Sequence, residues 1–392
     1  MKIKWVSSYK NAFQALPNIL KTFVLQWGQW PDMAFMPFFM ITSFPSAIST
    51  CFLHFMHLPS AIRHHLKFDN PNLTGNYIKT SAPTLNMLNK DQQKRLQEAD
   101  YRIFGPHGHS AVKLCHWCKE SIKTGEKRVC YKQLFYGIKS HRCLQMTPCL
   151  PLCNLRCTHC WRDHSYFRPA PEGAMDSAKT IAEGSLEAQR KLLVGLGGVE
   201  HSEQHLKEAM EPTNAAISLD GEPTLYPYLS NLIAEYQKRG MTTFLVSNGM
   251  RPDVLDTLDP LPFQLYISVT SPNQAFFEKT QHPIEPASWQ KLMETLELLP
   301  NMKCRTVIRL TLAKNFNIEG TVKEFAKLVS KAQPTFVEPK AFMPIGASRA
   351  RLPFEAMPSH DEILKFSEAL AEETGYKIAG ESKPSRVVLL KK

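Results

Sequence analysis

The chain has 392 residues, of which 43% are hydrophobic and 21% charged, and its formal net charge is +11. These values exclude a disordered or low-complexity protein and are typical of two or three globular domains with a sizeable core. The basic balance favours an anionic partner. Nucleic acid is the first candidate, a membrane surface is the second, and a basic surface that only faces solvent is the alternative.

Residues 1–86 differ from the rest of the chain. No Lys, Arg, Asp or Glu occurs between Met33 and Ile62, but prolines interrupt this apolar stretch. A spanning helix needs about 20 apolar residues with few breaks, so a membrane segment is the alternative interpretation. An amphipathic helix is predicted over residues 87–100. We therefore expect Met87 to be the functional start, and residues 1–86 to be an atypical apolar extension that is dispensable or wrongly assigned to the protein.

The segment from residue 101 to residue 148 is rich in Cys, His and aromatic residues. Its weak hydrophobic periodicity predicts a loop-rich segment that a metal centre holds together. Eight of the ten cysteines in the chain lie between Cys115 and Cys160. Disulfide frameworks are usual in small secreted domains, so this density in a long chain indicates metal or iron–sulfur ligation in a reducing compartment.

From Cys143 onward, strand and helix patterns alternate. Strands are predicted at residues 143–150, 215–220, 242–247, 264–270, 303–312 and 335–342, and helices at 226–239, 287–299, 319–332 and 360–373. Repeated β-α units of this length favour a parallel sheet with helices outside it. Six units are too few for a closed eight-stranded barrel, so we predict an α/β fold with a partial, open (β/α)6 TIM-like barrel. Its working face lies at the C-terminal ends of the strands.

The strongest chemical signal follows the first of these strands, where Cys153, Cys157 and Cys160 have the spacing Cys-x3-Cys-x2-Cys. Three thiolates on one tight loop can hold three irons of a 4Fe–4S cube and leave the fourth iron open. Structural zinc usually takes four ligands in paired Cys-x2-Cys units, so zinc is the weaker alternative. Cys149 lies on the strand side, and we interpret it as structural.

These three cysteines, with Trp161 beside the last one, resemble the signature of the radical S-adenosylmethionine (SAM) superfamily. The resemblance implies that the open iron binds SAM, which one electron cleaves to a 5′-deoxyadenosyl radical. The strand ends and turns expected to hold SAM carry Ser218, Gly221, Glu222, Asn248 and Ser268, and Arg309 on the fifth predicted strand is a further candidate. Ordinary strand-end turns are the alternative for these segments. A buried arginine on a strand needs a carboxylate partner, which we expect for Arg309.

From Tyr101 to the C-terminus the chain resembles a narrower family, the archaeal 4-demethylwyosine synthases of the wybutosine pathway. The matching runs include Tyr101-Arg-Ile-Phe-Gly105, Cys130-Tyr-Lys132, Phe135-Tyr-Gly-Ile-Lys-Ser-His-Arg-Cys143, Asp220-Gly-Glu-Pro-Thr-Leu225 and Phe336-Val-Glu-Pro-Lys340. The resemblance implies a second 4Fe–4S cluster on Cys115, Cys130 and Cys143. Cys118 is an extra thiol, either a spare ligand or a fourth one that closes this cluster.

The substrates of that family are pyruvate and N1-methylguanosine beside the anticodon of tRNA-Phe, and the product is a tricyclic base. The resemblance therefore implies a cytoplasmic, monomeric, tRNA-modifying carbon–carbon lyase that uses SAM and two 4Fe–4S clusters. Lys132 matches the lysine proposed to form a Schiff base with pyruvate, whereas a surface lysine that contacts phosphate is the alternative. An external one-electron donor, such as a ferredoxin or flavodoxin, is expected.

Composition and the resemblance together divide the chain into the extension 1–86, an auxiliary iron–sulfur segment 87–142, and a radical SAM core with C-terminal tRNA-binding elements at 143–392. Basic residues crowd the auxiliary segment, and Arg349 and Arg351 lie in a predicted loop. We expect them to contact tRNA phosphates, with Trp117, Tyr131, Tyr136 and Trp161 as candidates for base stacking. Two alternatives stay open, another radical SAM enzyme with an auxiliary cluster and a non-catalytic zinc- and RNA-binding protein.

Overall fold

The computed structural model describes residues 87–392, and the predicted apolar extension at 1–86 lies outside them. The described residues belong to one compact unit. None of the helices within them is both long and apolar enough to cross a membrane. The boundary expected at residue 143 stays a prediction.

One ten-stranded sheet organises the fold, in the order β1-β2-β3-β4-β5-β6-β7-β8-β10-β9. Six neighbouring strands run parallel, namely β3 (Cys143–Thr147), β4 (Asn214–Ile217), β5 (Thr242–Ser247), β6 (Gln264–Ser268), β7 (Arg305–Leu312) and β8 (Phe336–Ala341). Each of them pairs with the next one along the chain, as repeated β-α units require. Because the sheet order has two ends, the sheet is open, and the predicted six-unit partial barrel is confirmed.

Short elements on both sides of this barrel were not predicted. The hairpin of β1 (Arg102–Phe104) and β2 (Ser110–Val112) joins β3, whereas β10 (Val387–Lys391) joins β8 and pairs with β9 (Lys377–Ser382). Together with α7 (His116–Thr124) and α8 (Tyr131–Tyr136), the hairpin shows that the prediction of a loop-rich segment before Cys143 was wrong. These four elements are three to nine residues long, too short for a clear hydrophobic period.

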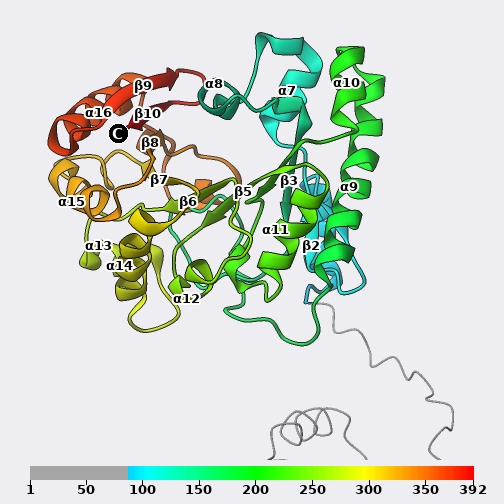
Figure 1. Ribbon diagram of the computed structural model, residues 1–392, viewed down its shortest axis with the longest axis horizontal. Coiled ribbons are helices and arrows are strands. Elements are labelled where there is room, and N and C mark those ends of the chain that lie inside the picture. The colour runs from blue at the N-terminus through cyan, green and yellow to red at the C-terminus, as the bar shows by residue number, and fades with distance from the viewer. Residues whose placement is uncertain (1–86) are drawn as a thin grey trace, which may run out of the picture. The chain divides into compact units, whose positions relative to one another are not determined.

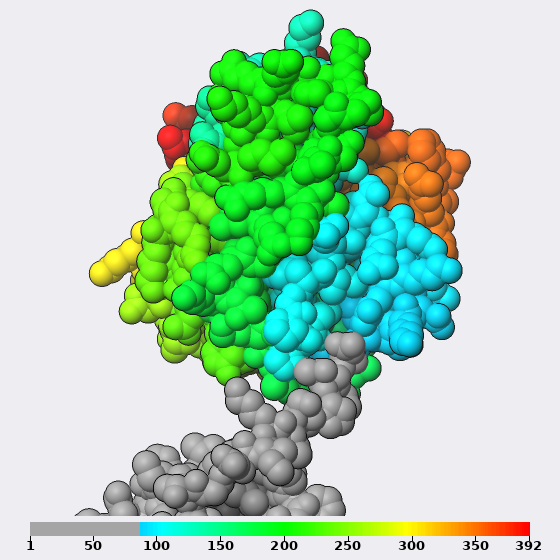
Figure 2. All heavy atoms as spheres, turned by 90° about the vertical axis from the view of Figure 1, so that its right-hand side faces the viewer, coloured from blue at the N-terminus to red at the C-terminus, as the bar shows by residue number. Residues whose placement is uncertain are grey.

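Helices cover the outer face of the parallel strands (Figure 1). They are α9 (Ala178–Val194), α11 (Leu229–Lys238), α12 (Pro252–Asp256), α13 (Gln274–Gln281), α14 (Ser288–Leu298), α15 (Val322–Ala332) and α16 (His360–Thr374). Alternate strand residues such as Ile308 and Leu310 face them in the main core. Figure 2 shows α9 and α10 (Glu203–Ala209) on one side, beside the segment that begins with α6 (Lys90–Glu98).

The long helix α9 escaped prediction because it contains Gly184, a residue that weakens helices. A Cβ at this position would lie 2.6 Å from the ring of Phe104 on β1. The glycine therefore lets α9 pack tightly against the hairpin, and tertiary packing outweighs its low helix propensity.

The inner face of the sheet carries a second cluster of buried side chains. It is formed by Phe244 on β5, Tyr266 on β6, Val307 on β7, Phe336 on β8 and Leu389 on β10, with Ile138 next to α8. Phe135 and Tyr136 of α8 pack against this cluster. The helix α8 therefore lies on the inner face of the partial barrel, near α7 at the top of Figure 1.

Candidate active site

The loop after β3 carries Cys153, Cys157 and Cys160 at the C-terminal edge of the parallel strands. Hydrogen bonds fix its backbone on two sides. Cys153 N donates to the carbonyl of Arg168 at 2.9 Å, and Thr158 N donates to the carbonyl of Thr280 at 2.8 Å. Burial, followed by the neighbouring thiols, raises the pKa of Cys157 well above its usual range. A metal centre that binds thiolates would offset this cost.

The spacing of the thiols favours a cluster over a single ion. Within residues 87–392, only His107, His109 and Asp176 form a group of three ligand atoms that all lie within 4.8 Å of one another. Zinc bonds of about 2.3 Å in a tetrahedron place the sulfurs about 4 Å apart, so neither set of cysteines is arranged for one zinc ion. A four-iron cube separates its ligands more widely. The donor chemistry of Cys153, Cys157 and Cys160, three thiolates on one loop, fits a 4Fe–4S cluster.

The trio around Asp176 is a packing element. Both ring nitrogens of His109 are engaged, since Nδ1 lies 2.7 Å from the carbonyl oxygen of Pro148 and Nε2 accepts from Asp176 N at 2.7 Å. Neither nitrogen is left to bind a metal ion. These bonds join the β1–β2 hairpin to the start of the cysteine loop.

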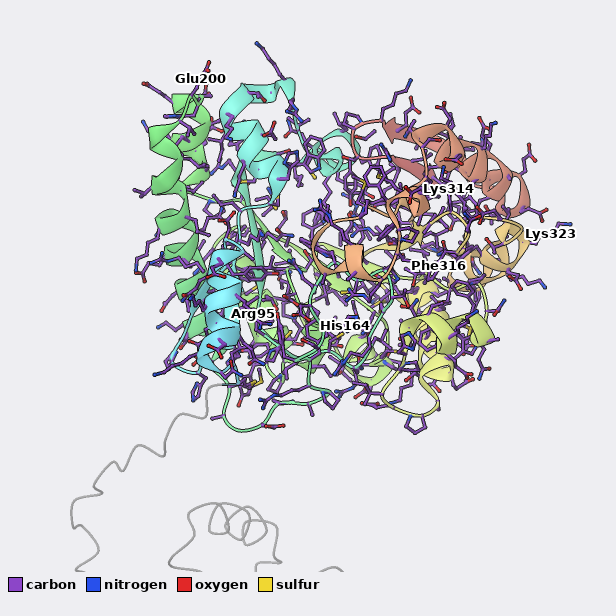
Figure 3. All side chains as sticks on the ribbon, turned by 180° about the vertical axis from the view of Figure 1, so that it is seen from behind. Arg95, His164, Glu200, Lys314, Phe316 and Lys323 are labelled. Carbon is purple, nitrogen blue, oxygen red and sulfur yellow. The ribbon has the colours of Figure 1, made fainter. Side chains whose placement is uncertain are left out.

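A single arginine from the C-terminal part of the chain braces the cysteine loop. The Nε of Arg351 donates to the carbonyl of Thr158 at 3.1 Å, and its Nη2 donates to the carbonyls of Cys160 and Arg162. Ala347 N donates to the carbonyl of Trp161 at 3.0 Å. The segment between β8 and α16 therefore packs on the cysteine loop. It lies in front of the strands when the molecule is seen from behind (Figure 3).

Five of the residues predicted to bind SAM lie at the ends of neighbouring strands. Ser218, Gly221 and Glu222 follow β4, Asn248 follows β5, and Ser268 is the last residue of β6. Gly221 has φ +67°, and a Cβ there would lie 2.8 Å from the carbonyl oxygen of Cys149. This close approach of two loops requires glycine. The contacts of these residues with SAM stay a prediction.

Glu222 holds these strand ends together. Its buried carboxylate accepts hydrogen bonds from the hydroxyl of Thr224 at 2.7 Å, the hydroxyl of Ser247 at 2.8 Å and Asn248 N at 2.7 Å. Burial raises the pKa of Glu222, although these donors act against the shift. Asn248 in turn donates from Nδ2 to Asn154 in the cysteine loop at 2.8 Å. Glu222 thus fixes Asn248 relative to Cys153 and its neighbours.

The second set of cysteines lies at the opposite edge of the strands. Cys115 directly precedes α7, Cys130 directly precedes α8, and Cys143 is the first residue of β3. Thr147 ends β3, next to the first cysteine loop. Because a strand rises about 3.3 Å per residue, β3 separates the two sets by a distance on the order of 15 Å. The inner face of the sheet spans this distance.

Lys132 of α8 lies over the inner face between the two sets. Its Nζ is 4.6 Å from the ring centroid of Tyr266 and 4.9 Å from that of Phe244, and both rings are buried. Burial first, and the guanidinium of Arg309 second, lower the pKa of Lys132. A lowered pKa favours the neutral amine, which is the nucleophilic form. This environment differs from that of a surface lysine that contacts phosphate.

Arg309 has the carboxylate partner that the sequence led us to expect, and the partner is Glu338. The two side chains pair at 3.1 Å across β7 and β8, where they are also register partners. Arg309 donates to the hydroxyl of Tyr131 at 2.7 Å. Glu338 accepts from the hydroxyls of Tyr131 at 3.2 Å and Tyr136 at 2.6 Å. The structure therefore places Arg309 beside Lys132.

The same bonds correct one expectation about aromatic residues. Tyr131 is buried, and its hydroxyl and that of Tyr136 are engaged with Glu338, so these tyrosines belong to the site interior and not to a base-stacking surface. Trp161 remains a candidate, since 37% of its surface is exposed. The sequence reasoning missed Glu338 as a site residue. The sequence did contain a signal for this role, because Glu338 and Lys340 are two positions apart on one predicted strand.

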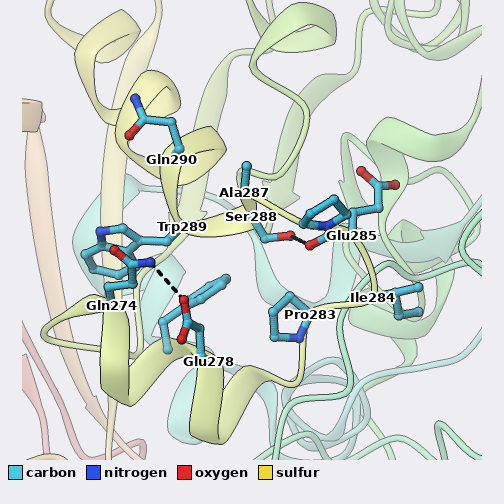
Figure 4. Close-up of a pocket in the computed structure, with 11 residues that line it drawn as sticks. Gln274, Glu278, Pro283, Ile284, Glu285, Ala287, Ser288, Trp289 and Gln290 are labelled. Atoms are coloured by element: carbon cyan, nitrogen blue, oxygen red, sulfur yellow. Dashed lines mark hydrogen bonds between the residues drawn. The ribbon is translucent and has the colours of Figure 1, made fainter.

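A pocket of about 650 Å³ lies elsewhere, between α13 and the start of α14 (Figure 4). Gln274, Glu278 and Trp289 are among the residues that line it. None of the residues predicted from sequence to bind SAM, pyruvate or iron lines this pocket. We therefore place the chemistry on the inner face of the sheet.

Comparisons with known proteins agree with this geometry. Residues 147–329 match the radical SAM superfamily, and residues 331–392 match the family described as wyosine base formation. The S-adenosyl-L-methionine-dependent tRNA 4-demethylwyosine synthase of Pyrococcus abyssi is 48% identical over 299 residues, which cover 74% of this chain and 85% of that protein. The chain belongs to the tRNA 4-demethylwyosine synthase family.

Other members of the tRNA 4-demethylwyosine synthase family match over similar lengths. The synthase of Methanocaldococcus jannaschii is 38% identical, and the match covers 78% of this chain and 96% of that one. A solved structure of TYW1 with a lysine–pyruvate adduct bound has a TM-score of 0.70 and 37% identity, again over 78% of this chain and 96% of that one. A crystal structure of archaeal TYW1 has a TM-score of 0.63 and 35% identity.

Proposed function

We propose that this chain is a tRNA 4-demethylwyosine synthase. It condenses N1-methylguanosine beside the anticodon of tRNA-Phe with pyruvate to form the tricyclic 4-demethylwyosine base. Membership of the radical SAM superfamily supports SAM and a 4Fe–4S cluster as cofactors. The observation that carries the proposal is the position of Lys132 on the inner face of the barrel, between two sets of cysteines.

The protein contributes binding and orientation to this reaction. Cys153, Cys157 and Cys160 would hold the cluster that supplies the electron for cleavage of SAM. Glu222 and Asn248 keep the strand ends beside that loop in place. The amine of Lys132 adds to the keto carbon of pyruvate and water leaves, so that an imine forms. The imine holds the oxo acid at the inner face of the sheet. The family's solved lysine–pyruvate adduct supports this role.

The finer parts of the proposal concern the auxiliary segment. We assign a second 4Fe–4S cluster to Cys115, Cys130 and Cys143, and keep residues 87–142 and 143–392 as the auxiliary segment and the radical SAM core with C-terminal tRNA-binding elements. An external ferredoxin or flavodoxin would supply electrons to a cytoplasmic monomer. The free cysteines of the described residues support a reducing compartment.

The ion pairs of the auxiliary segment reduce the number of basic residues that are candidates for contacts with tRNA phosphates. Lys119 pairs with Asp100 and Arg128 pairs with Glu120. Lys123 and Lys127 are exposed, and neither forms an ion pair to any residue from 87 to 392. We assign the phosphate contacts of the auxiliary segment to these two lysines first.

The test is an anaerobic incubation of tRNA that contains N1-methylguanosine with the iron-loaded protein, SAM, pyruvate and a reductant. Mass spectrometry of the nucleosides should show that the base gains two carbons of pyruvate, and the Lys132→Ala variant should give no product. Iron analysis should find about eight irons per chain. SAM cleavage without a change in the base would instead support another radical SAM enzyme, and bound zinc without SAM cleavage would support a binding protein.

A further inference from the structure

Charged side chains lie beside the aromatic rings that contact Lys132. We propose that Arg309 recognises the carboxylate of the 2-oxo acid that Lys132 binds, and that the buried Glu338 holds Arg309 in position. This inference rests on the proposed function, because it assumes that Lys132 receives the oxo acid. It moves Arg309 from the predicted SAM site to the site of the second substrate.

The first support is that the amine and the guanidinium share one aromatic ring. The Nζ of Lys132 lies 4.6 Å from the ring centroid of Tyr266, and the Cζ of Arg309 lies 4.4 Å from the same centroid. The keto carbon and the carboxylate of a 2-oxo acid are bonded to each other. An amine that attacks the keto carbon therefore needs a carboxylate receptor as its neighbour, and Arg309 is that neighbour.

The second support is the pattern of hydrogen bonds that the guanidinium of Arg309 makes. Its Nε donates to Glu338 at 3.1 Å, and its Nη2 bonds Tyr131 and pairs with Glu338. No hydrogen bond to any group of residues 87–392 involves Nη1. The side chain of Arg309 is 18% exposed, whereas that of Glu338 is 0% exposed. The Nε and Nη2 atoms of Arg309 are thus engaged by Glu338 and Tyr131, whereas Nη1 is left to bind a ligand.

The third support is the balance of charge on this part of the inner face. Lys132, Arg309 and Lys340 gather around Glu338, the carboxylate that pairs with Arg309. The Nζ of Lys340 is engaged, because it donates to the carbonyl of Ser385 at 2.6 Å. Because Lys132 acts as a neutral amine, Arg309 is the cation of this group that has donors left for an anionic ligand.

The experiment traps the imine without tRNA, SAM or electrons. The iron-loaded protein is incubated anaerobically with cyanoborohydride and a series of pyruvate concentrations, or with acetaldehyde, which has a carbonyl group and no carboxylate. Lys132 loses water with the carbonyl compound to form an imine, and hydride from the cyanoborohydride reduces it to a stable amine. Peptide mass spectrometry reads the extent of labelling at Lys132.

The variants are chosen so that loss of the protein fold does not imitate the result. Arg309→Met removes the receptor, and Arg309→Met with Glu338→Gln also removes the buried carboxylate that would be left unpaired. Arg305→Met is the matched control, because Arg305 lies on the same strand and its guanidinium covers the rings of Tyr136 and Phe336. Thermal unfolding of each variant reports on the fold.

We expect both Arg309 variants to raise the half-saturating pyruvate concentration, relative to that of acetaldehyde, by roughly 10- to 100-fold, as loss of a charge-assisted hydrogen bond predicts. The Arg305 variant should leave the ratio unchanged. The ratio cancels any change in the reactivity of the amine itself. An unchanged ratio in the Arg309 variants would overturn the proposal.

Two further outcomes separate this inference from others. If the Arg309 variants lose affinity for SAM and keep their pyruvate ratio, the carboxylate that Arg309 binds is that of SAM, and the inference is wrong. If the unmodified protein takes up neither carbonyl compound at Lys132, the proposed function itself fails, and this inference fails with it.

Discussion

Cys115 and Cys118 are three residues apart and belong to or contact the same buried cluster, yet their sulfurs make different hydrogen bonds. Cys115 caps α7 and its sulfur accepts from Cys118 N at 3.3 Å. Cys118 is buried in a cluster with Leu114, Ile122 and Leu193, and its thiol donates to the carbonyl of His141 at 3.6 Å. A thiol with apolar neighbours and its own acceptor behaves as a core residue.

We therefore expect Cys118→Ala to keep the full iron content, whereas Cys115→Ala loses the second cluster. The expected difference is about four irons per chain, measured by iron and sulfide analysis after anaerobic reconstitution. Equal losses in both variants would mean that Cys118 is also a ligand.

A pH-dependent stability is expected from Lys340. Burial first, and Arg309 second, lower the pKa of Lys340 from its ordinary 10.5 to about 8. The unfolded chain then binds more protons than the folded protein between pH 8 and pH 10.5, so this side chain makes stability rise with pH across that window.

Relative to Lys340→Met, the free energy of unfolding of the unmodified protein should rise by up to about 1.4 kcal/mol per pH unit above pH 8. Urea unfolding at pH 7.5, 8.5 and 9.5 measures this difference. Parallel pH profiles of the two proteins would contradict the lowered pKa.

At the scale of elements, the segment between β8 and α16 acts on the cysteine loop. Arg351 donates to three carbonyls of that loop, whereas the nearby Arg349 donates from Nε to the carbonyl of Pro344 in its own segment. The two arginines therefore form a matched pair that separates bracing of the loop from positive charge alone.

We expect Arg351→Gln to release iron to a chelator at least about tenfold faster than Arg349→Gln, because hydrogen bonds to a charged group contribute about 1.5–3 kcal/mol each. Absorbance of the chelate over time measures the rate under anaerobic conditions. Equal rates in the two variants would show that Arg351 does not hold the loop.

At the scale of the whole molecule, the first two residues that the structure describes are buried in the hydrophobic core. Met87 is 1% exposed within the main core cluster, and Leu88 is 1% exposed beside Leu96 and Tyr101. Residues 331–392, which match the wyosine family, supply β8, β10 and the brace of the cysteine loop. Both ends of the described chain thus support the same sheet.

A chain that starts at Met87 should keep the thermal stability and product formation of the full chain. A chain that starts at Asn89 should lose about 2–5 kcal/mol of stability, because two buried side chains are removed. Calorimetry and the tRNA assay measure both. Loss of product by the Met87 chain alone would show that residues 1–86 belong to the working protein.

The sequence by itself determined the order of the six β-α units and the cysteine loop after the first strand, whereas the second set of cysteines followed from a family resemblance and stays a prediction. Strand period and ligand spacing are local properties, so they can be read from neighbouring residues. Only the tertiary structure decided that Arg309 lies beside Lys132, that Glu338 is its partner and that Arg351 braces the loop. These contacts join residues far apart in the chain, 178 positions for Arg309 and Tyr131 and 193 for Arg351 and Thr158. The arrangement of the strands in the partial barrel brings them together, and no local pattern records it.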